Sequence, residues 1–295
     1  MALVSIGVPV YNGERYLREA VDSALQQSHS ELELIILDNA STDGTEAIAR
    51  EYAARDDRVR YERNDHNVGP IANYNHAFLR ARGEYFKWLA SDDVCMPDMV
   101  ERCLAVLEAR RDVVLATTRF REIGPAGEPI GDQQYTIDLA APSPHERLAN
   151  LMSTPAGHPM LYGVARTTAL ARTSLMAPYQ GSDRALLAEL CLLGRIVELQ
   201  EVAWLSRDHP GRSPAVLGRK DWDPSQKPGQ LRHVAIARHM SYEILTAPLS
   251  VSERARCMFQ LVKSATLRSR DLLPAFMSEI SAAVRHQLRH LLNRA

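Results

Sequence analysis

The sequence is poor in cysteine, in long apolar runs and in net charge, and each shortage excludes a class of protein. Its four cysteines, Cys95, Cys103, Cys191 and Cys257, lie far apart and form no C-x-x-C pair, which argues against a zinc site and a disulfide framework. No apolar run approaches the roughly 20 residues that span a bilayer, and no basic-then-apolar signal segment opens the chain. The formal net charge is -1, so we expect no overall attraction to nucleic acid or anionic lipid. The expected location of the protein is the cytoplasm.

What is present is the composition of an ordinary folded protein, with 45% hydrophobic and 24% charged residues in a chain of 295. Short β-rich runs alternate with helical periodicity, which predicts a mostly parallel sheet flanked by helices. The expected strands are residues 2–10, 32–38, 58–63, 84–90, 112–120 and 195–205. Residues 121–142 carry Gly and Pro without periodicity and predict a flexible surface excursion. We expect a Rossmann-like α/β domain over residues 1–224 and a C-terminal helical extension over 225–295.

Unusual residues, most of them polar, stand at the ends of three of the expected strands. They are Pro9, Tyr11 and Asn12 at the end of the first strand, Asp38 and Asn39 at the end of the second, and Asp92 and Asp93 after the fourth. Ligands of an open parallel sheet bind beyond the carboxyl ends of its strands. A ring, an amide and a carboxylate suit a nucleotide base, and an acidic pair suits a cation on a diphosphate. The sequence therefore outlines a nucleotide site.

Most of these features also have a purely structural explanation. Residues 11–13 fit a turn, and Asp43 with Glu46 fits a capping box for the following helix. Asp92 and Asp93 fit either a solvated turn before a helix or a site for Mg²⁺ or Mn²⁺, which carboxylates and substrate phosphates bind together. Asp38 is harder to explain in this way, because an unpaired charge directly after "LIIL" is costly near the core.

Four segments together resemble the inverting family-2 glycosyltransferases of the GT-A fold. They are "VSIGVPVYNGERYLREAVDSALQQS", "LELIILDNASTDGT", "NVGPIANYNHAF" and "GEYFKWLASDDVCMPDMVE". They are similar to the family's opening strand and helix, its second-strand motif, the segment before its third helix and its acidic D-x-D region. The resemblance covers about the first half of the chain and is fainter up to Pro210. It implies a GT-A fold with the C-terminal helical layer outside the family pattern.

The resemblance also implies a set of nucleotide-binding residues. They are Pro9, Tyr11, Asn12, Asp38, Asn39, Gly69, Asn73 and Asn75. In this reading the first three frame the base, Asp38 accepts a hydrogen bond from it, as uracil recognition requires, and the last three approach the nucleotide. A UDP-linked donor is favoured only because such donors are common in the family.

The metal ligands and the catalytic base are likewise implied by the resemblance. Asp92 would be the principal ligand of Mg²⁺ or Mn²⁺, with Asp93 nearby and His209 of "RDHPGRS" close to the metal and diphosphate. Asp183 of "GSDRALLAEL" would be the catalytic base. The structural alternatives are a turn residue for His209, which precedes Pro and Gly, and a helix N-cap for Asp183 ahead of Arg184.

Two positions depart from the family pattern. The family often has another Asp where Ala90 or Ser91 stands here, and often a Glu where Ser182 stands. The first departure leaves one fewer carboxylate for the cation. The second weakens the assignment of the neighbouring Asp183 as base.

The expected activity is metal-assisted transfer of a sugar, with inversion, from a nucleotide-diphosphate sugar to a hydroxyl of a saccharide or lipid-linked acceptor. One alternative is a nucleotidyltransferase, although "PVYNGERY" stands where a glycine-rich triphosphate loop would be. Another is a non-catalytic nucleotide-sugar-binding module. Val251–Ala295 carries eight Lys and Arg against three acids, so the C-terminal helices either contact the inner face of a membrane peripherally or form a cap on the catalytic domain.

Overall fold

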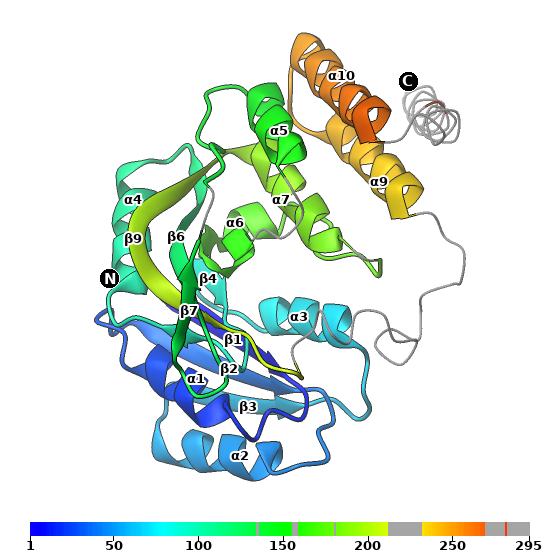
Figure 1. Cartoon of the computed structure of the whole chain (residues 1–295). Helices are drawn as coiled ribbons and strands as arrows, with labels where there is room; N and C mark the ends of the chain where they lie inside the picture. The colour runs from blue at the N-terminus through cyan, green and yellow to red at the C-terminus, as the bar shows by residue number, and fades with distance from the viewer. Residues whose placement is uncertain (134–135, 155–158, 180, 212–231, 269–280, 282–295) are drawn as a thin grey trace.

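A nine-stranded sheet forms the centre of the molecule, and Figure 1 shows it in a computed structural model that describes residues 1–133, 136–154, 159–179, 181–211, 232–268 and 281. Its strands are β1 (Val4–Val10), β2 (Leu32–Asp38), β3 (Val59–Arg63), β4 (Tyr85–Trp88), β5 (Val94–Cys95), β6 (Val113–Ile123), β7 (Pro129–Asp132), β8 (Val164–Arg166) and β9 (Arg195–Arg207). They are ordered β3-β2-β1-β4-β8-β6-β9-β5, and β7 pairs with β6.

The longer ladders of the sheet are parallel, as the sequence predicts. β1 pairs with β2 and β4, and β2 with β3, all in parallel register. Every residue of β1, β2 and β4 is buried, as is usual for strands covered on both faces, and this explains their continuous apolar runs. The parallel register brings the carboxyl ends of β1, β2 and β4 to one edge of the sheet.

The second half of the sheet curls around two long strands. β6 and β9 run parallel, with β8 antiparallel to both β4 and β6, and Figure 1 shows β9 curving across the molecule. The short strand β5 pairs antiparallel with the end of β9, so that Val94 lies opposite Leu205 and Cys95 opposite Trp204. This pairing places the acidic turn after β4 beside the segment that follows β9.

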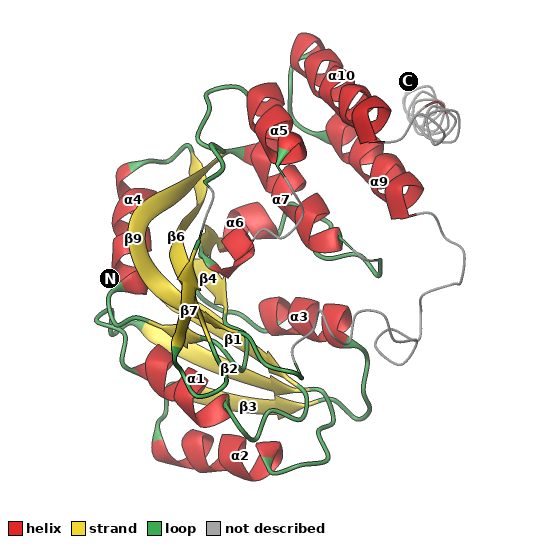
Figure 2. Ribbon diagram, in the orientation of Figure 1, coloured by secondary structure: helices red, strands yellow, loops and turns green. Residues whose placement is uncertain are grey.

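Helices cover both faces of the sheet and form a further layer. They are α1 (Leu17–Leu25), α2 (Thr45–Arg55), α3 (Pro70–Leu79), α4 (Met99–Ala109), α5 (Pro144–Ser153), α6 (Thr167–Leu170), α7 (Ser182–Leu193), α9 (Arg232–Thr246) and α10 (Val251–Arg268), with a 3₁₀ turn at Pro159–Tyr162. Figure 2 shows α1 and α2 on one side of β1–β3 and α3 on the other. Ser143 and Glu146 form a reciprocal capping box at the start of α5.

The predicted flexible excursion over residues 121–142 is wrong for much of its length. β6 continues to Ile123, and β7 returns beside it as the second strand of a hairpin whose turn includes Gly127 at φ 85°. β7 is mostly exposed, so it has no alternation of apolar and polar residues for a sequence reading to detect. Farther along, Ile137 and Leu139 are buried in the core.

The C-terminal helices α9 and α10 form the predicted helical layer. Ala237, Met240 and Ile244 of α9 and Cys257 and Leu261 of α10 belong to the same buried cluster as side chains of α5 and α7. The predicted boundary between residues 224 and 225 lies outside the described residues. Across the part of the chain that is described, no helix combines the length and apolarity needed to cross a bilayer.

Candidate active site

The predicted polar residues lie at one edge of the sheet. Val10 is opposite Asp38 and Gly7 opposite Trp88 in the parallel register, so the loops that follow β1, β2 and β4 leave the sheet on the same side. Tyr11 is 49% exposed at the end of β1, whereas Pro9 is buried within the strand. The edge therefore offers one free aromatic ring beside several polar loops.

The turn after β1 is tied to the loop after β2. Asn12 has a left-handed backbone, φ 51°, which asparagine tolerates better than most residues. Its Oδ1 accepts a hydrogen bond from the Thr42 amide at 2.8 Å, and its own amide donates to Ser41 Oγ at 2.9 Å. These bonds hold the chain in a bend after β1, and the ring of Tyr11 is left exposed.

Asp38 is fully buried and partnered. Its Oδ2 accepts hydrogen bonds from Arg63 Nη1 at 2.5 Å and the Tyr61 hydroxyl at 3.0 Å, and its Oδ1 accepts one from the Ser41 amide at 2.8 Å. Burial, followed by the hydrogen bond to Asp38, raises the pKa of Tyr61 to about 12. A carboxylate offers about four acceptor positions, so Oδ1 keeps capacity for one more donor. The sequence reading missed Tyr61 and Arg63.

An asparagine network holds the loop between β3 and α3. Asn39 Nδ2 donates to Asn67 Oδ1 at 2.8 Å, and Asn64 Nδ2 donates to both Asn39 Oδ1 at 3.1 Å and Asn73 Oδ1 at 2.8 Å. The loop ends at Gly69, whose φ of 84° precedes α3. Asn39 and Asn73 are each 2% exposed, so in this conformation their amides shape the loop that borders the site.

Asn75 fastens α3 to the segment that leads into α7. Its Nδ2 donates to the Met176 carbonyl at 2.8 Å, and its Oδ1 accepts from the Met176 amide at 3.1 Å. This two-way bond ties the segment that precedes α7 to α3, which lies between α7 and the strands β1 and β2 in Figure 1.

The two adjacent acids after β4 face different surroundings. Asp93 is 3% exposed, and its oxygens accept hydrogen bonds from Trp204 Nε1 at 3.1 Å and the Arg207 amide at 2.9 Å. Asp92 has a side chain that is 24% exposed, and its Oδ2 lies 2.9 Å from His209 Nε2. The pair is therefore tolerated because one carboxylate accepts hydrogen bonds from buried donors while the other points toward His209.

Arg207 is a buried cation that the sequence reading missed. Its side chain is 1% exposed, and it donates to the Asp92 carbonyl at 2.9 Å and to Glu19 Oε2 at 2.5 Å. Its guanidinium lies over the ring of Tyr16 at 4.7 Å, and the same ring lies 4.9 Å from that of His209. These contacts fix the backbone of Asp92 and the ring of His209. An arginine two residues before a histidine gives no sequence signal that it is buried.

Asp183 lies in the first turn of α7, and its side chain is exposed. The helix is capped by Gly181 at φ 90°, so the alternative of Asp183 as the N-cap is not what the structure has. The first turn of a helix favours negative charge, so this position suits an acidic side chain.

Asp92 and His209 suit a divalent cation in their chemistry. A carboxylate oxygen and an imidazole nitrogen are both ligands of Mn²⁺ and related ions, they lie at hydrogen-bond distance from each other, and both side chains are partly exposed. The hydrogen bond from Arg207 to the Asp92 carbonyl and the contact of the Tyr16 ring with the His209 ring hold both residues in place before any ion binds.

Comparison with known proteins identifies the relatives of this chain. Residues 5–160, more than half of the chain, match Glycosyl transferase family 2. An uncharacterised glycosyltransferase of Rickettsia typhi is 39% identical over 115 residues, which are 38% of this chain and 35% of that protein. The chain therefore aligns with about a third of the length of this relative.

Two solved structures share the fold at low sequence identity. Staphylococcus aureus TarS residues 1–349 in complex with UDP-GlcNAc has a TM-score of 0.69 and 17% identity, covering 97% of this chain and 81% of that one. The mannosyltransferase PcManGT from Pyrobaculum calidifontis in complex with GDP-Man and Mn²⁺ has a TM-score of 0.56 and 18% identity, covering 96% and 75%. The GT-A fold expected from the sequence is thereby confirmed, and the chain belongs to glycosyl transferase family 2.

Proposed function

We propose that this chain transfers a sugar from a nucleotide-diphosphate sugar, with UDP-linked donors favoured, to an acceptor hydroxyl with inversion. The observation that carries the proposal is the Asp92–His209 pair, 2.9 Å apart and partly exposed, beside an edge that also presents the free ring of Tyr11. The solved structures of similar fold are bound to UDP-GlcNAc and to GDP-Man, which supports a nucleotide sugar as the donor.

The base of the nucleotide would stack on Tyr11, whose ring is 49% exposed. Asp38 would accept a hydrogen bond from the base through Oδ1. Because Asp38 is fully buried, the base reaches it only if a covering side chain moves, and Arg63, which is 32% exposed, is the candidate. Asn39, Gly69, Asn73 and Asn75 would act by shaping the loops around the nucleotide.

Asp92 and His209 would hold the Mg²⁺ or Mn²⁺ that accompanies the donor, and the bound Mn²⁺ of PcManGT supports this class of ion. When bound, such a cation acts as a Lewis acid that stabilises the negative charge of the leaving diphosphate. Asp93 would contribute by position, since both of its oxygens already accept protein hydrogen bonds that hold the end of β9.

Asp183 would remove the proton of the acceptor hydroxyl. The acceptor oxygen then forms its bond to the anomeric carbon as the bond from that carbon to the diphosphate breaks on the opposite face. The proton passes to the Asp183 carboxylate, and general-base assistance of this kind contributes about 10²–10⁴-fold. Saccharide and lipid-linked hydroxyls both fit this step.

The test is a panel of sugar nucleotides with Mn²⁺ and saccharide acceptors, followed by release of UDP or GDP and by NMR of the product anomer. We expect Asp92→Ala to abolish metal-dependent release, and Asp183→Asn to lower kcat while donor binding stays close to wild type. Asp57→Asn is the control, because Asp57 is exposed in the turn between α2 and β3, at the amino end of β3 and away from the carboxyl strand ends that border the site. Full turnover by Asp183→Asn, or a retained anomeric configuration, would contradict the mechanism.

The same assay separates the alternatives. A nucleotidyltransferase would release pyrophosphate from a nucleoside triphosphate, and a non-catalytic binding module would bind donor without releasing nucleotide. Peripheral membrane contact of the C-terminal helices stays a prediction, for which co-sedimentation of the full chain with phosphatidylserine vesicles is the assay.

A further inference from the structure

A second group of metal-ligating side chains lies between α7 and the C-terminal layer, apart from the Asp92–His209 pair. Glu189 of α7 and His239 and Glu243 of α9 bring one ligand atom each to within 4.8 Å of one another. His239 and Glu243 are four residues apart on one helix and so share a face. Glu189 Oε1 lies 2.7 Å from His239 Nε2. Neither the donor site nor the proposed mechanism uses these residues.

The protein partners of this group are unevenly distributed. Glu189 is 3% exposed and accepts hydrogen bonds from the amide and hydroxyl of Ser174, at 2.7 and 2.8 Å. Burial, followed by the charge of Glu189, raises the pKa of Glu243 to about 7. Two carboxylates thus face each other with an imidazole as their nearest compensating group, an arrangement that a divalent cation would stabilise.

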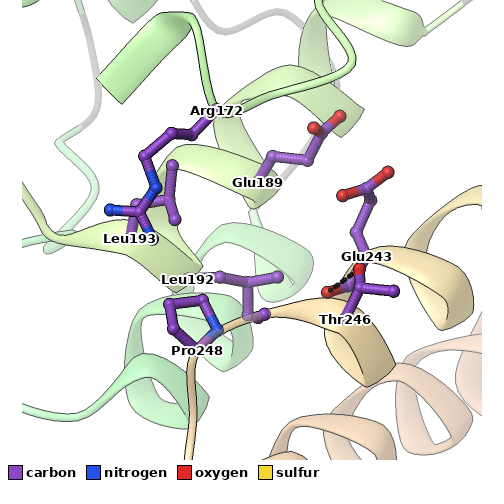
Figure 3. Close-up of a pocket in the computed structure, with 8 residues that line it drawn as sticks. Arg172, Glu189, Leu192, Leu193, Glu243, Thr246 and Pro248 are labelled. Atoms are coloured by element: carbon purple, nitrogen blue, oxygen red, sulfur yellow. Dashed lines mark hydrogen bonds between the residues drawn. The ribbon is translucent and has the colours of Figure 1, made fainter. Parts of the chain in front are cut away.

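A cavity of about 320 Å³ adjoins the group. Its lining residues are Arg172, Glu189, Leu192, Leu193, Glu243, Thr246, Ala247 and Pro248. Figure 3 shows the carboxylates of Glu189 and Glu243 on one side of this cavity and the Arg172 guanidinium on the other. The cavity therefore has room for the water molecules that complete a coordination sphere, and its one guanidinium lies away from the carboxylates.

Tyr179 gives an independent sign that the site is incomplete. Its hydroxyl oxygen is buried and has no hydrogen-bond partner among the described residues. Its ring meets that of His239 edge-on, with the ring centroids 5.9 Å apart. Burial, followed by the charges of Glu189, Glu243 and Asp183, raises the pKa of the Tyr179 hydroxyl. A buried hydroxyl without a partner is costly, and a metal-bound water is a partner it would accept.

We propose that Glu189, His239 and Glu243 bind a divalent transition-metal ion, Zn²⁺ in particular, at a structural site separate from the donor site. One imidazole with two carboxylates is a ligand set for Zn²⁺, whereas Mg²⁺ prefers oxygen ligands alone. On binding, His239 gives Nε2 to the metal and carries its proton on Nδ1. The wide spacing of the cysteines speaks only against zinc bound by thiolates and does not bear on this set.

The consequence of such a site is a cross-link between two parts of the fold. The ion would join α9 to α7, and α7 carries Asp183 in its first turn, six residues before Glu189. Metal bound by residues from two helices stabilises their packing, because the site exists only when both are folded.

The test is Zn²⁺ binding by the metal-free full-length chain, measured by isothermal titration calorimetry. All proteins carry Asp92→Ala, so that the donor site does not contribute. We expect one Zn²⁺ per chain and no comparable binding of Mg²⁺. His239→Ala and Glu243→Gln should each lower the Zn²⁺ affinity by at least roughly 10–100-fold, the loss that removal of an outer-sphere partner causes. Glu243→Gln preserves the side-chain shape, so it also serves if His239→Ala does not fold.

His145→Ala is the matched control. His145 Nδ1 pairs with Glu253 Oε2 at 3.0 Å between α5 and α10 of the same layer, without a third ligand among the described residues. This variant should bind Zn²⁺ like its Asp92→Ala parent and show the same Zn²⁺-induced rise in Tm, which Glu243→Gln should lose. Unchanged Zn²⁺ binding in both His239→Ala and Glu243→Gln, or equal loss in His145→Ala, would overturn the site. None of these measurements depends on glycosyl transfer.

Discussion

The adjacent acids Asp92 and Asp93 should respond to the same substitution in opposite ways. Asp93→Asn replaces a carboxylate that accepts from Trp204 Nε1 and the Arg207 amide with an amide that offers one acceptor and one donor. One of the two buried donors then loses its partner, which costs about 1–3 kcal/mol. Asp92→Asn changes a side chain that is 24% exposed, and we expect a stability change within about 0.5 kcal/mol.

Urea unfolding followed by tryptophan fluorescence measures both effects, and Trp204 reports the region directly. For a chain of this size, each 1 kcal/mol lowers Tm by about 2–4 °C. In the transfer assay the order should reverse, with Asp92→Asn losing metal-dependent turnover and Asp93→Asn retaining metal affinity when folded. Equal loss of stability in the two variants, or a stable Asp93→Asn protein that no longer binds Mn²⁺, would refute the division of roles.

Three further outcomes are expected. Tyr11→Ala should weaken UDP binding by about 1–3 kcal/mol, the value of one aromatic–base stack. Tyr242→Ala, which removes a ring of similar exposure, should leave UDP binding unchanged. Equal calorimetric affinities of the wild type and both variants would argue against stacking. The four cysteines are buried, and burial raises the pKa of the Cys103, Cys191 and Cys257 thiols to about 12, so native protein at pH 8 should react with iodoacetamide far more slowly than urea-unfolded protein. Gly194→Ala should lower the free energy of unfolding by about 1–3 kcal/mol in the same urea titration, because a Cβ there would lie 2.8 Å from the Asp112 carbonyl oxygen. An unchanged free energy of unfolding would mean that the backbone before β6 shifts to make room.

The parallel half of the sheet was predictable because its strands are buried on both faces. "LELIILD" begins and ends at the residues predicted for the second strand, and its apolar run leaves little choice of register. The hairpin of β6 and β7 was not predictable, because β7 lies at the sheet's margin with most of its residues exposed. Its pairing depends on the backbone of β6 and not on a pattern of side chains.

The site was predictable to the level of its position but not of its contacts. Strand ends and family motifs placed the polar residues at one edge, yet the sequence did not reveal that Asp93 is buried and Asp92 partly exposed. That difference depends on β5 pairing with β9, which brings Trp204 and Arg207 into hydrogen-bond contact with Asp93, more than 100 positions earlier in the chain. The Glu189–His239–Glu243 group was invisible for the same reason, since its members meet only when α9 packs on α7.

The single residue Gly194 joins α7 to β9, and this short connection affects how the fold can vary. One helix, one glycine and one strand lead from Asp183, near the start of the helix, to His209, just past the end of the strand. If Asp183 and His209 act as proposed, a change in the length of a surface loop elsewhere does not alter the stretch of chain that joins them.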